Sequence, residues 1–244
     1  MRVIVKDTYA EVCEVAGGMI TKVVQDDPHA TLGLATGSSA QAVYPYIIRA
    51  YERGEVDFSQ VHSVNLDEYI GLTPDHDQSY RYFMNTNFFD HVNIKKENTF
   101  VASGIGKEED IVKQFRAVLA ASKVDVQLLG IGVDGHVGFN EPGKVLHSEA
   151  HIEVLDESTI KANSRFFASE DEVPKKAVTM GMGDIMRAKK LILVASGAPK
   201  ANAIKELIMN DEITVSNPST MIKMHPDCTV IIDRPLADLV GYQG

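Results

Sequence analysis

Short apolar runs alternate with segments of helical period along most of this chain. The runs are short enough to be buried strands, and the helical segments carry apolar residues spaced to cover a sheet. This alternation predicts an α/β fold: a doubly wound, mostly parallel, Rossmann-like open sheet with helices on both faces. The expected strands are residues 3–5, 31–35, 61–66, 124–129, 190–196 and 229–232, and the expected helices are 8–25, about 40–50, 79–89, 107–121, about 200–209 and 219–223.

We expect one domain spanning residues 1–244, because no linker-like stretch divides the chain. The net charge of −10 argues against a nucleic-acid partner, while leaving room for a local basic pocket that binds a small anion. No signal peptide or membrane-spanning apolar run is present, so we expect a cytoplasmic protein without a membrane partner. The two cysteines, Cys13 and Cys228, lie in apolar surroundings and are expected to be buried free thiols.

The segment 130–142 follows the most apolar expected strand and reads G-I-G-V-D-G-H-V-G-F-N-E-P. It combines a glycine-rich loop with two carboxylates (Asp134, Glu141), the imidazole of His136 and the amide of Asn140. Open α/β sheets bind ligands at the carboxyl ends of their strands. An imidazole beside carboxylates is typical of a proton-transfer site.

Three glycines of this segment also match the dinucleotide-binding pattern G-x-G-x-x-G, namely Gly130, Gly132 and Gly135. That pattern requires its third glycine to open a helix whose amino terminus holds a pyrophosphate. No helical period follows here, and Asp134 would repel the phosphates. The sequence therefore disfavours a dinucleotide cofactor.

Two further strand-end loops have features of anion sites. The turn 36–39 (T-G-S-S) lies between an expected strand and helix, which is how backbone N–H groups come to hold a phosphate; a plain helix N-cap by Ser38 or Ser39 is the alternative. Lys200 stands in the first turn of a helix, where its charge opposes the helix dipole unless an anion lies in front of it.

Two adjacent acids, Asp67 and Glu68, follow the strand at 61–66. They are either a solvated turn or part of the acid/base site. Because the four loops share one sheet edge, they can converge on a single ligand. A phosphorylated small molecule that undergoes proton transfer is the simplest substrate for two anion-binding and two acid/base loops.

The chain resembles the glucosamine-6-phosphate deaminase family. The resemblance rests on long, collinear motifs, which are L-x-T-G-S-S (34–39), N-L-D-E-Y (65–69), S-Y-x-x-F-M-x-x-N-F-F-D-H-V (79–92), D-G-H-V-G-F-N-E-P (134–142), N-S-R-F-F (163–167) and the lysine after L-V-A-S-G-A-P. It implies conversion of D-glucosamine 6-phosphate and water to D-fructose 6-phosphate and ammonia without a metal or organic cofactor. It also implies a mobile lid around residues 156–178.

The resemblance assigns roles to matching positions. His136 is implied to open the pyranose ring, and Asp134 and Glu141 to orient and polarise the imidazole of His136. Asp67 is implied to carry the proton from C2 toward C1. The implied phosphate ligands are Thr36, Gly37, Ser38, Ser39, Arg165 and Lys200.

Three alternatives compete with this interpretation. A 6-phosphogluconolactonase-like hydrolase would not need the carbon base that N-L-D-E-Y offers. A sugar-phosphate sensor would not need the full set of acids, and no DNA-binding segment precedes the first expected strand. A metal hydrolase using Asp134, His136 and Glu141 would lack the usual clustered histidines.

The resemblance also bears on regulation. In the allosteric hexameric members of the family, a serine, an arginine and a lysine bind an activating N-acetylated sugar phosphate, and here Lys144, His151 and Glu153 align with them. Glu153 is negative where that phosphate would sit, and the carboxyl-terminal segment of those members has no counterpart after residue 244. We therefore expect a monomer or weak homo-oligomer without that response.

Overall fold

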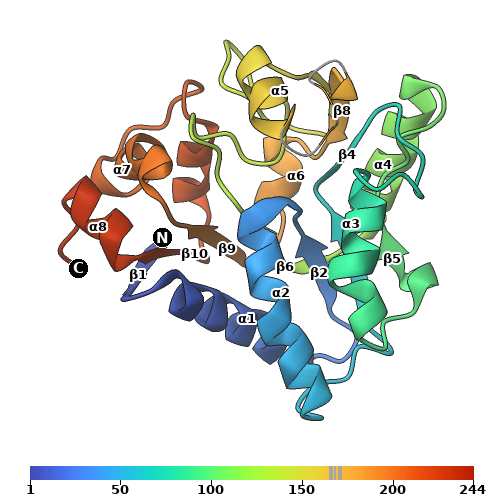
Figure 1. Ribbon diagram of the computed structural model, residues 1–244, viewed down its shortest axis with the longest axis horizontal. Coiled ribbons are helices and arrows are strands. Elements are labelled where there is room, and N and C mark those ends of the chain that lie inside the picture. The colour runs from blue at the N-terminus through green and yellow to red at the C-terminus, as the bar shows by residue number, and fades with distance from the viewer. Residues whose placement is uncertain (165–166, 168, 170–171) are drawn as a thin grey trace.

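A seven-stranded parallel sheet forms the centre of the computed structural model, which describes residues 1–164, 167, 169 and 172–244 (Figure 1). Its strand order, β1-β10-β9-β6-β2-β3-β5, confirms the predicted open α/β fold. The strands are β1 (Arg2–Lys6), β2 (Thr31–Leu34), β3 (His62–Asn65), β5 (Thr99–Phe100), β6 (Val124–Leu129), β9 (Leu191–Ala195) and β10 (Cys228–Asp233).

The strand order reverses direction at the centre of this sheet. From β2 the chain runs outward through β3 to β5, and it then returns to place β6 on the other side of β2. The loops that leave β2 and β6 therefore diverge and open a crevice, which is where open α/β sheets bind ligands.

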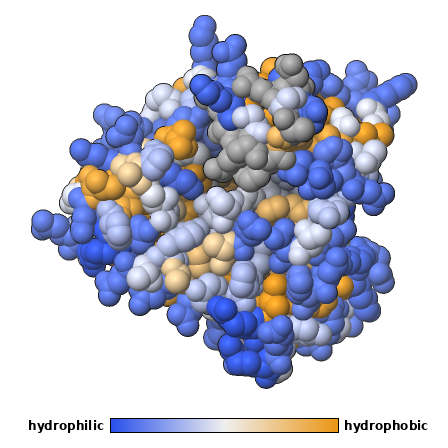
Figure 2. All heavy atoms as spheres, viewed as in Figure 1, coloured by the Kyte–Doolittle hydropathy of each residue, from blue (hydrophilic) through white to orange (hydrophobic). Residues whose placement is uncertain are grey.

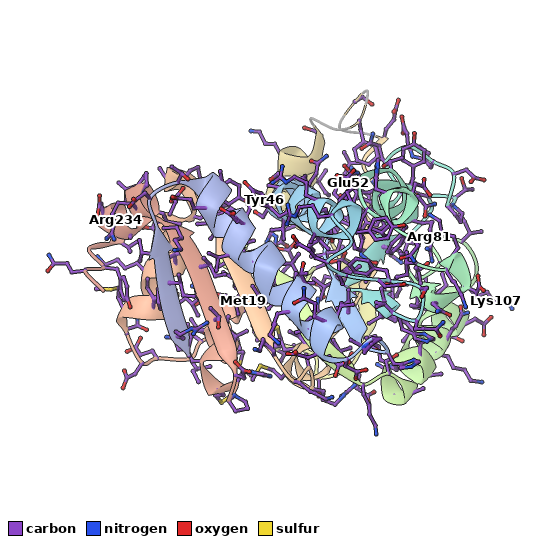
Figure 3. The ribbon with its side chains drawn as sticks, turned by 90° about the horizontal axis from the view of Figure 1, so that it is seen from below. Met19, Tyr46, Glu52, Arg81, Lys107 and Arg234 are labelled. Atoms are coloured by element: carbon purple, nitrogen blue, oxygen red, sulfur yellow. The ribbon has the colours of Figure 1, made fainter. Side chains whose placement is uncertain are left out.

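Helices cover the sheet much as the periodicity predicted. Figure 3 shows α1 lying across β1, β10 and β9, with α2 beside it. Gly17 of α1 permits this contact, because a Cβ atom there would lie 2.8 Å from Cβ of Tyr46 on α2. The helices are α1 (Tyr9–Asp26), α2 (Gly37–Glu52), α3 (Tyr80–Asn87), α4 (Glu108–Ala121), α5 (Glu157–Asn163), α6 (Met182–Met186), α7 (Ala201–Met209) and α8 (Arg234–Val240), with 3-10 turns η1 (Phe89–His91), η2 (Lys96–Asn98), η5 (Ala198–Lys200) and η6 (Pro218–Met224).

A second, antiparallel sheet of three short strands was not predicted. It consists of β4 (Asp67–Tyr69), β8 (Lys176–Thr179) and β7 (His151–Val154) in the order β4-β8-β7. Only Leu66 separates β3 from β4; its N–H donates to Leu34 O, while its carbonyl accepts from Met180 N. The predicted strand 61–66 therefore ends one residue early, and the acids after it begin a strand of the second sheet.

The surface is mainly hydrophilic, and both cysteines are buried, as the sequence led us to expect. Figure 2 shows one face of the molecule, on which hydrophilic residues predominate and apolar side chains are scattered. Cys13 and Cys228 are both buried and unpaired, as predicted. None of the helices among the described residues has the length and apolar content that a membrane span requires.

Candidate active site

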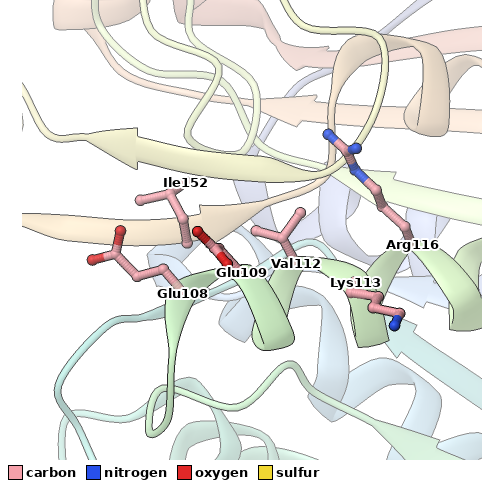
Figure 4. Close-up of a pocket in the computed structure, with 6 residues that line it drawn as sticks. All are labelled: Glu108, Glu109, Val112, Lys113, Arg116 and Ile152. Atoms are coloured by element: carbon pink, nitrogen blue, oxygen red, sulfur yellow. The ribbon is translucent and has the colours of Figure 1, made fainter.

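A cavity of about 270 Å³ opens at the carboxyl ends of β2 and β6, in the crevice where the strand order reverses. The loops predicted to carry chemistry line it together. The lining residues include Thr36, Gly37, Ser38, Ser39, Asp67, Tyr80, Asp134, His136, Thr159 and Lys200. A larger hollow of about 500 Å³ lies between α4 and β7, where Glu108, Val112, Arg116 and Ile152 are among its lining residues (Figure 4). The described residues that line it include no imidazole or hydroxyl, so we place the candidate site in the smaller cavity.

His136 lies between two carboxylates. Its Nδ1 is 2.8 Å from Asp134 Oδ1 and 3.5 Å from Glu141 Oε2. Nδ1 of His136 makes no hydrogen bond within the described residues, so both contacts are close contacts between opposite charges when the imidazole is protonated. Gly132 makes this packing possible, because a Cβ atom at that position would lie 2.3 Å from Nδ1 of the imidazole.

The two carboxylates set the protonation of His136. Burial alone would lower the pKa of this imidazole, but Asp134 and Glu141 outweigh burial and raise it to about 9. For the Asp134 carboxyl the effect of burial is opposite, because burial acts to raise its pKa. The contacts of Asp134 with His136 outweigh burial and hold this pKa below its ordinary value. At neutral pH the imidazole therefore keeps a proton beside its carboxylates.

The same three side chains have the spacing of a metal site, since one ligand atom from each lies within 4.8 Å of the other two. Protonation of His136 and metal binding are alternatives for this cluster, because a metal ion would need the imidazole nitrogen without its proton. Activity in the presence of a chelator separates these two states.

Asp67 lies at the start of β4 and faces the cavity, although its side chain is largely buried. Burial first, and then the charge of Glu68, raise the pKa of Asp67 to about 8, while His136 opposes this shift. The loop after His136 passes close to this carboxyl at Gly138, where a Cβ atom would lie 3.5 Å from Asp67 Oδ2. The fold thus brings the two predicted acid/base loops to one cavity.

Glu68 is not the solvated residue that a turn would have given; it is 2% exposed. Its carboxylate accepts backbone N–H groups from Tyr69 (2.8 Å), Tyr80 (2.9 Å) and Arg81 (3.0 Å). Burial outweighs these hydrogen bonds and raises the pKa of Glu68 to about 7. Glu68 therefore ties the first turn of α3 to β4, and Tyr80 of that turn lines the cavity.

The candidate phosphate-binding loop opens α2. Thr36 is the N-cap residue, without a side-chain capping bond, so the alternative of an N-cap by Ser38 or Ser39 is wrong. Gly37 adopts a φ of +84°, a conformation that favours glycine.

Lys200 ends η5 and is the N-cap of α7, and its Nζ donates a 3.0 Å hydrogen bond to Ser39 Oγ. The two predicted anion loops therefore meet. Arg165 lies outside the described residues.

Thr159 gave no signal of its own in the sequence, and Asn140 gave one only as part of the loop 130–142. Thr159 of α5 donates a 2.7 Å hydrogen bond to Glu141 Oε1. Asn140 was noted only as an amide near the acids, and its Nδ2 donates to the carbonyls of Val137 (2.9 Å) and Met180 (2.8 Å). The polar stretch after residue 155 was the one hint of Thr159.

Comparison with known proteins identifies the family. A sequence model described as glucosamine-6-phosphate isomerases/6-phosphogluconolactonase matches residues 5–231. The chain belongs to this family. A glucosamine-6-phosphate deaminase from Thermoanaerobacter pseudethanolicus is 49% identical over 242 residues, which cover 98% of this chain and 95% of that protein.

Solved structures agree with this assignment. A monomeric glucosamine-6-phosphate deaminase superposes with a TM-score of 0.94 at 38% identity, covering 98% of this chain and all of that one. A 6-phosphogluconolactonase from Thermotoga maritima superposes with a TM-score of 0.73 at 17% identity, covering 96% of this chain and 99% of that one. The second likeness is one of fold alone.

Proposed function

We propose that this family member converts D-glucosamine 6-phosphate and water to D-fructose 6-phosphate and ammonia. The observation that carries the proposal is the convergence of two separate acid/base groups, His136 and Asp67, on one cavity that is also lined by the amino terminus of α2. The reaction needs a proton transfer at oxygen and another at carbon. Two groups on separate loops can each be adjacent to one of these positions.

His136 is proposed to open the sugar ring. The imidazole gives a proton to the ring oxygen and receives the proton of the anomeric hydroxyl, so that its own protonation is restored. The close contacts to Asp134 and Glu141 support this role, because they stabilise the protonated form between the two transfers. The product of this step is the open-chain aldehyde.

Asp67 is proposed to act on the open chain. Its carboxylate takes the proton from C2 while the substrate's ammonium group gives a proton to O1, which forms an enolamine, and the carboxyl group of Asp67 then returns its proton to C1. The carbonyl level of oxidation then resides at C2 as a protonated imine. Water adds to that carbon, its two protons pass to the nitrogen and the C–N bond breaks, so the ketone remains and the nitrogen leaves as ammonium, the protonated form of ammonia. The cavity position and burial of Asp67 support this assignment.

The phosphate is proposed to bind between the first turn of α2 and the lysine before α7. Thr36, Gly37, Ser38 and Ser39 supply N–H and hydroxyl donors, and Lys200 and Arg165 supply charge. The Lys200–Ser39 hydrogen bond supports this assignment, because it brings the lysine to the helix terminus. We further propose that residues 156–178 form a lid, since Thr159 of α5 contacts the site.

The cellular setting follows from the proposed substrate. A charged sugar phosphate does not cross a lipid bilayer unaided, so an enzyme acting on it works in the compartment where it is made. We therefore propose a cytoplasmic role in amino-sugar breakdown, including that of N-acetylglucosamine.

The decisive assay measures ammonia release from glucosamine 6-phosphate in the presence of a chelator. We expect activity comparable to that without chelator. The competing function in this family, hydrolysis of 6-phosphogluconolactone, is assayed in parallel and should be negligible. Loss of ammonia release on chelation would instead assign a metal to Asp134, His136 and Glu141, and efficient lactone hydrolysis without deamination would contradict the proposal.

A further inference from the structure

Two imidazoles and a carboxylate meet at the start of β7, outside the cavity described above. His147, His151 and Glu153 each place one ligand atom within 4.8 Å of the other two. We propose that these three side chains form a binding site for a divalent transition-metal ion, of which zinc fits the donor set best. Two histidines and one carboxylate are a donor set that zinc accepts, and imidazole nitrogen favours zinc, copper and nickel over magnesium or calcium.

The surroundings of His151 call for a cation. Its Nδ1 lies 3.1 Å from the carbonyl oxygen of Glu149, and its Nε2 lies 2.9 Å from Glu153 Oε2. A neutral imidazole has one N–H group, so it can donate to only one of these oxygens. The other nitrogen must share a proton or a metal ion with its neighbour. Metal-binding histidines commonly donate their second N–H to a backbone carbonyl, as His151 can to Glu149.

His147 favours a metal over a proton. Its ring centroid lies 4.2 Å from that of His151. A proton shared by His151 and Glu153 would gain nothing from a second imidazole beside it, whereas a metal ion takes that imidazole as a third ligand. Ligand atoms on one tetrahedral zinc ion lie about 3.3 Å apart, given Zn–N and Zn–O bonds of about 2.0–2.2 Å. His151 Nε2 and Glu153 Oε2 are already near that spacing. The side chain of His147 is exposed and can rotate to bring its nitrogen to the ion as the third ligand.

The backbone under the cluster is well supported. The carbonyls of His147 and Ser148 accept hydrogen bonds from Met182 N (2.8 Å) and Asp184 N (3.0 Å) at the start of α6. The approach is close because Gly181 lacks a side chain: a Cβ atom there would lie 2.5 Å from Glu149 N. His151 pairs with β8. Two ligands thus stand on backbone that is already ordered, which lowers the cost of binding an ion.

The cluster is separate from the larger hollow between α4 and β7, which lies on the other face of β7. Side chains alternate along a strand, so His151 and Glu153 point away from the face of Ile152, which lines the hollow in Figure 4. His151 is buried, whereas His147 is exposed. An ion held here would have water access on the His147 side, and water would fill its fourth coordination position.

The test is calorimetric titration of zinc into chelator-treated full-length protein, with thermal unfolding as a second readout. We expect one zinc ion at this cluster and a Tm that rises with zinc concentration, because an ion that binds only the folded state stabilises it. His147→Ala removes an exposed ligand and should fold; we expect it to weaken zinc binding at least 10-fold and to abolish the rise in Tm.

Two control variants separate this site from others. His76→Ala removes an exposed histidine that pairs with Asp77 and belongs to neither of the two clusters with metal-ligand spacing among the described residues, and this variant should bind zinc as wild type does. His136→Gln disrupts the Asp134–His136–Glu141 cluster and should also retain the zinc ion. Absence of zinc binding, binding that survives His147→Ala, or binding lost with His136→Gln would each overturn the proposal.

Discussion

Thr159 Oγ1 donates a 2.7 Å hydrogen bond to Glu141 Oε1, and this bond joins α5 to the carboxylates around His136. The Glu141 side chain is 4% exposed, and its other oxygen has no hydrogen bond within the described residues. The hydroxyl of Thr159 is therefore the donor that holds this carboxylate in place beside the imidazole.

Replacing Thr159 should impair catalysis more than folding. Thr159→Val keeps the shape and removes the hydroxyl, and we expect kcat/KM to fall about 10-fold or more, since a hydrogen bond to a charged group contributes about 1.5–3 kcal/mol. Thr159→Ser should retain most of the activity. Because the loss acts through the His136 cluster, the pH profile of kcat should also shift. A valine variant with wild-type kinetics would show that the bond does not position Glu141.

The sequence predicted the central sheet because its strands are continuous apolar runs between long amphipathic helices. It missed the second sheet, whose strands are short and partly polar; D-E-Y at 67–69 reads equally well as a turn. The same limit applies to the site. Asp67 and His136 follow strong strands and could be placed at the sheet edge. Thr159 reaches Glu141 only through packing of α5, which no local pattern encodes.

Asp67→Asn should separate binding from turnover. Asparagine has the same shape as aspartate but cannot accept the C2 proton, so we expect kcat to fall by orders of magnitude and KM to change little. Exchange of the C2 proton with deuterated solvent should disappear with it. Near-normal turnover in the variant would mean that another group is the carbon base.

Asp67 and His136 should make the protein less stable as pH rises. Both pKa values are raised on folding, Asp67 from 3.8 to about 8 and His136 from 6.5 to about 9. The folded state therefore binds more protons, and its stability is lost through pH 4–8 for Asp67 and pH 6.5–9 for His136. Each 1 kcal/mol of this loss lowers Tm by about 2–4 °C in a chain of this size.

Thermal unfolding of Asp67→Asn at several pH values checks this linkage. The variant cannot ionise at this position, so it should exceed wild type in Tm at pH 8 and show a flatter pH dependence. Equal slopes for the two proteins between pH 5 and 8 would contradict the raised pKa of Asp67.

Lys200→Ala should weaken substrate binding, because a charged hydrogen bond to phosphate contributes about 1.5–3 kcal/mol. We expect KM to rise about 10-fold or more, and Arg165→Ala to act in the same direction. Lys205→Ala is the matched control, since it removes an exposed lysine from α7, the helix that begins directly after Lys200. Unphosphorylated glucosamine should be a very poor substrate for wild type. Similar efficiency with both sugars would remove the phosphate site from the mechanism.

The protein should show hyperbolic saturation and no response to N-acetylglucosamine 6-phosphate. The family resemblance implies an arginine and a lysine at these positions in the allosteric members, whereas here His151 and Glu153 occupy them and lie 2.9 Å apart. An effector shifts a conformational equilibrium only if it binds one state better, and its phosphate finds a carboxylate in place of a lysine. Kinetics are measured with a chelator present, so that no metal ion bound by His147, His151 and Glu153 supplies the missing positive charge. Light scattering should show a monomer or weak association. A hexamer whose Hill coefficient exceeds one and falls when the effector is added would show this interpretation of His151 and Glu153 to be wrong.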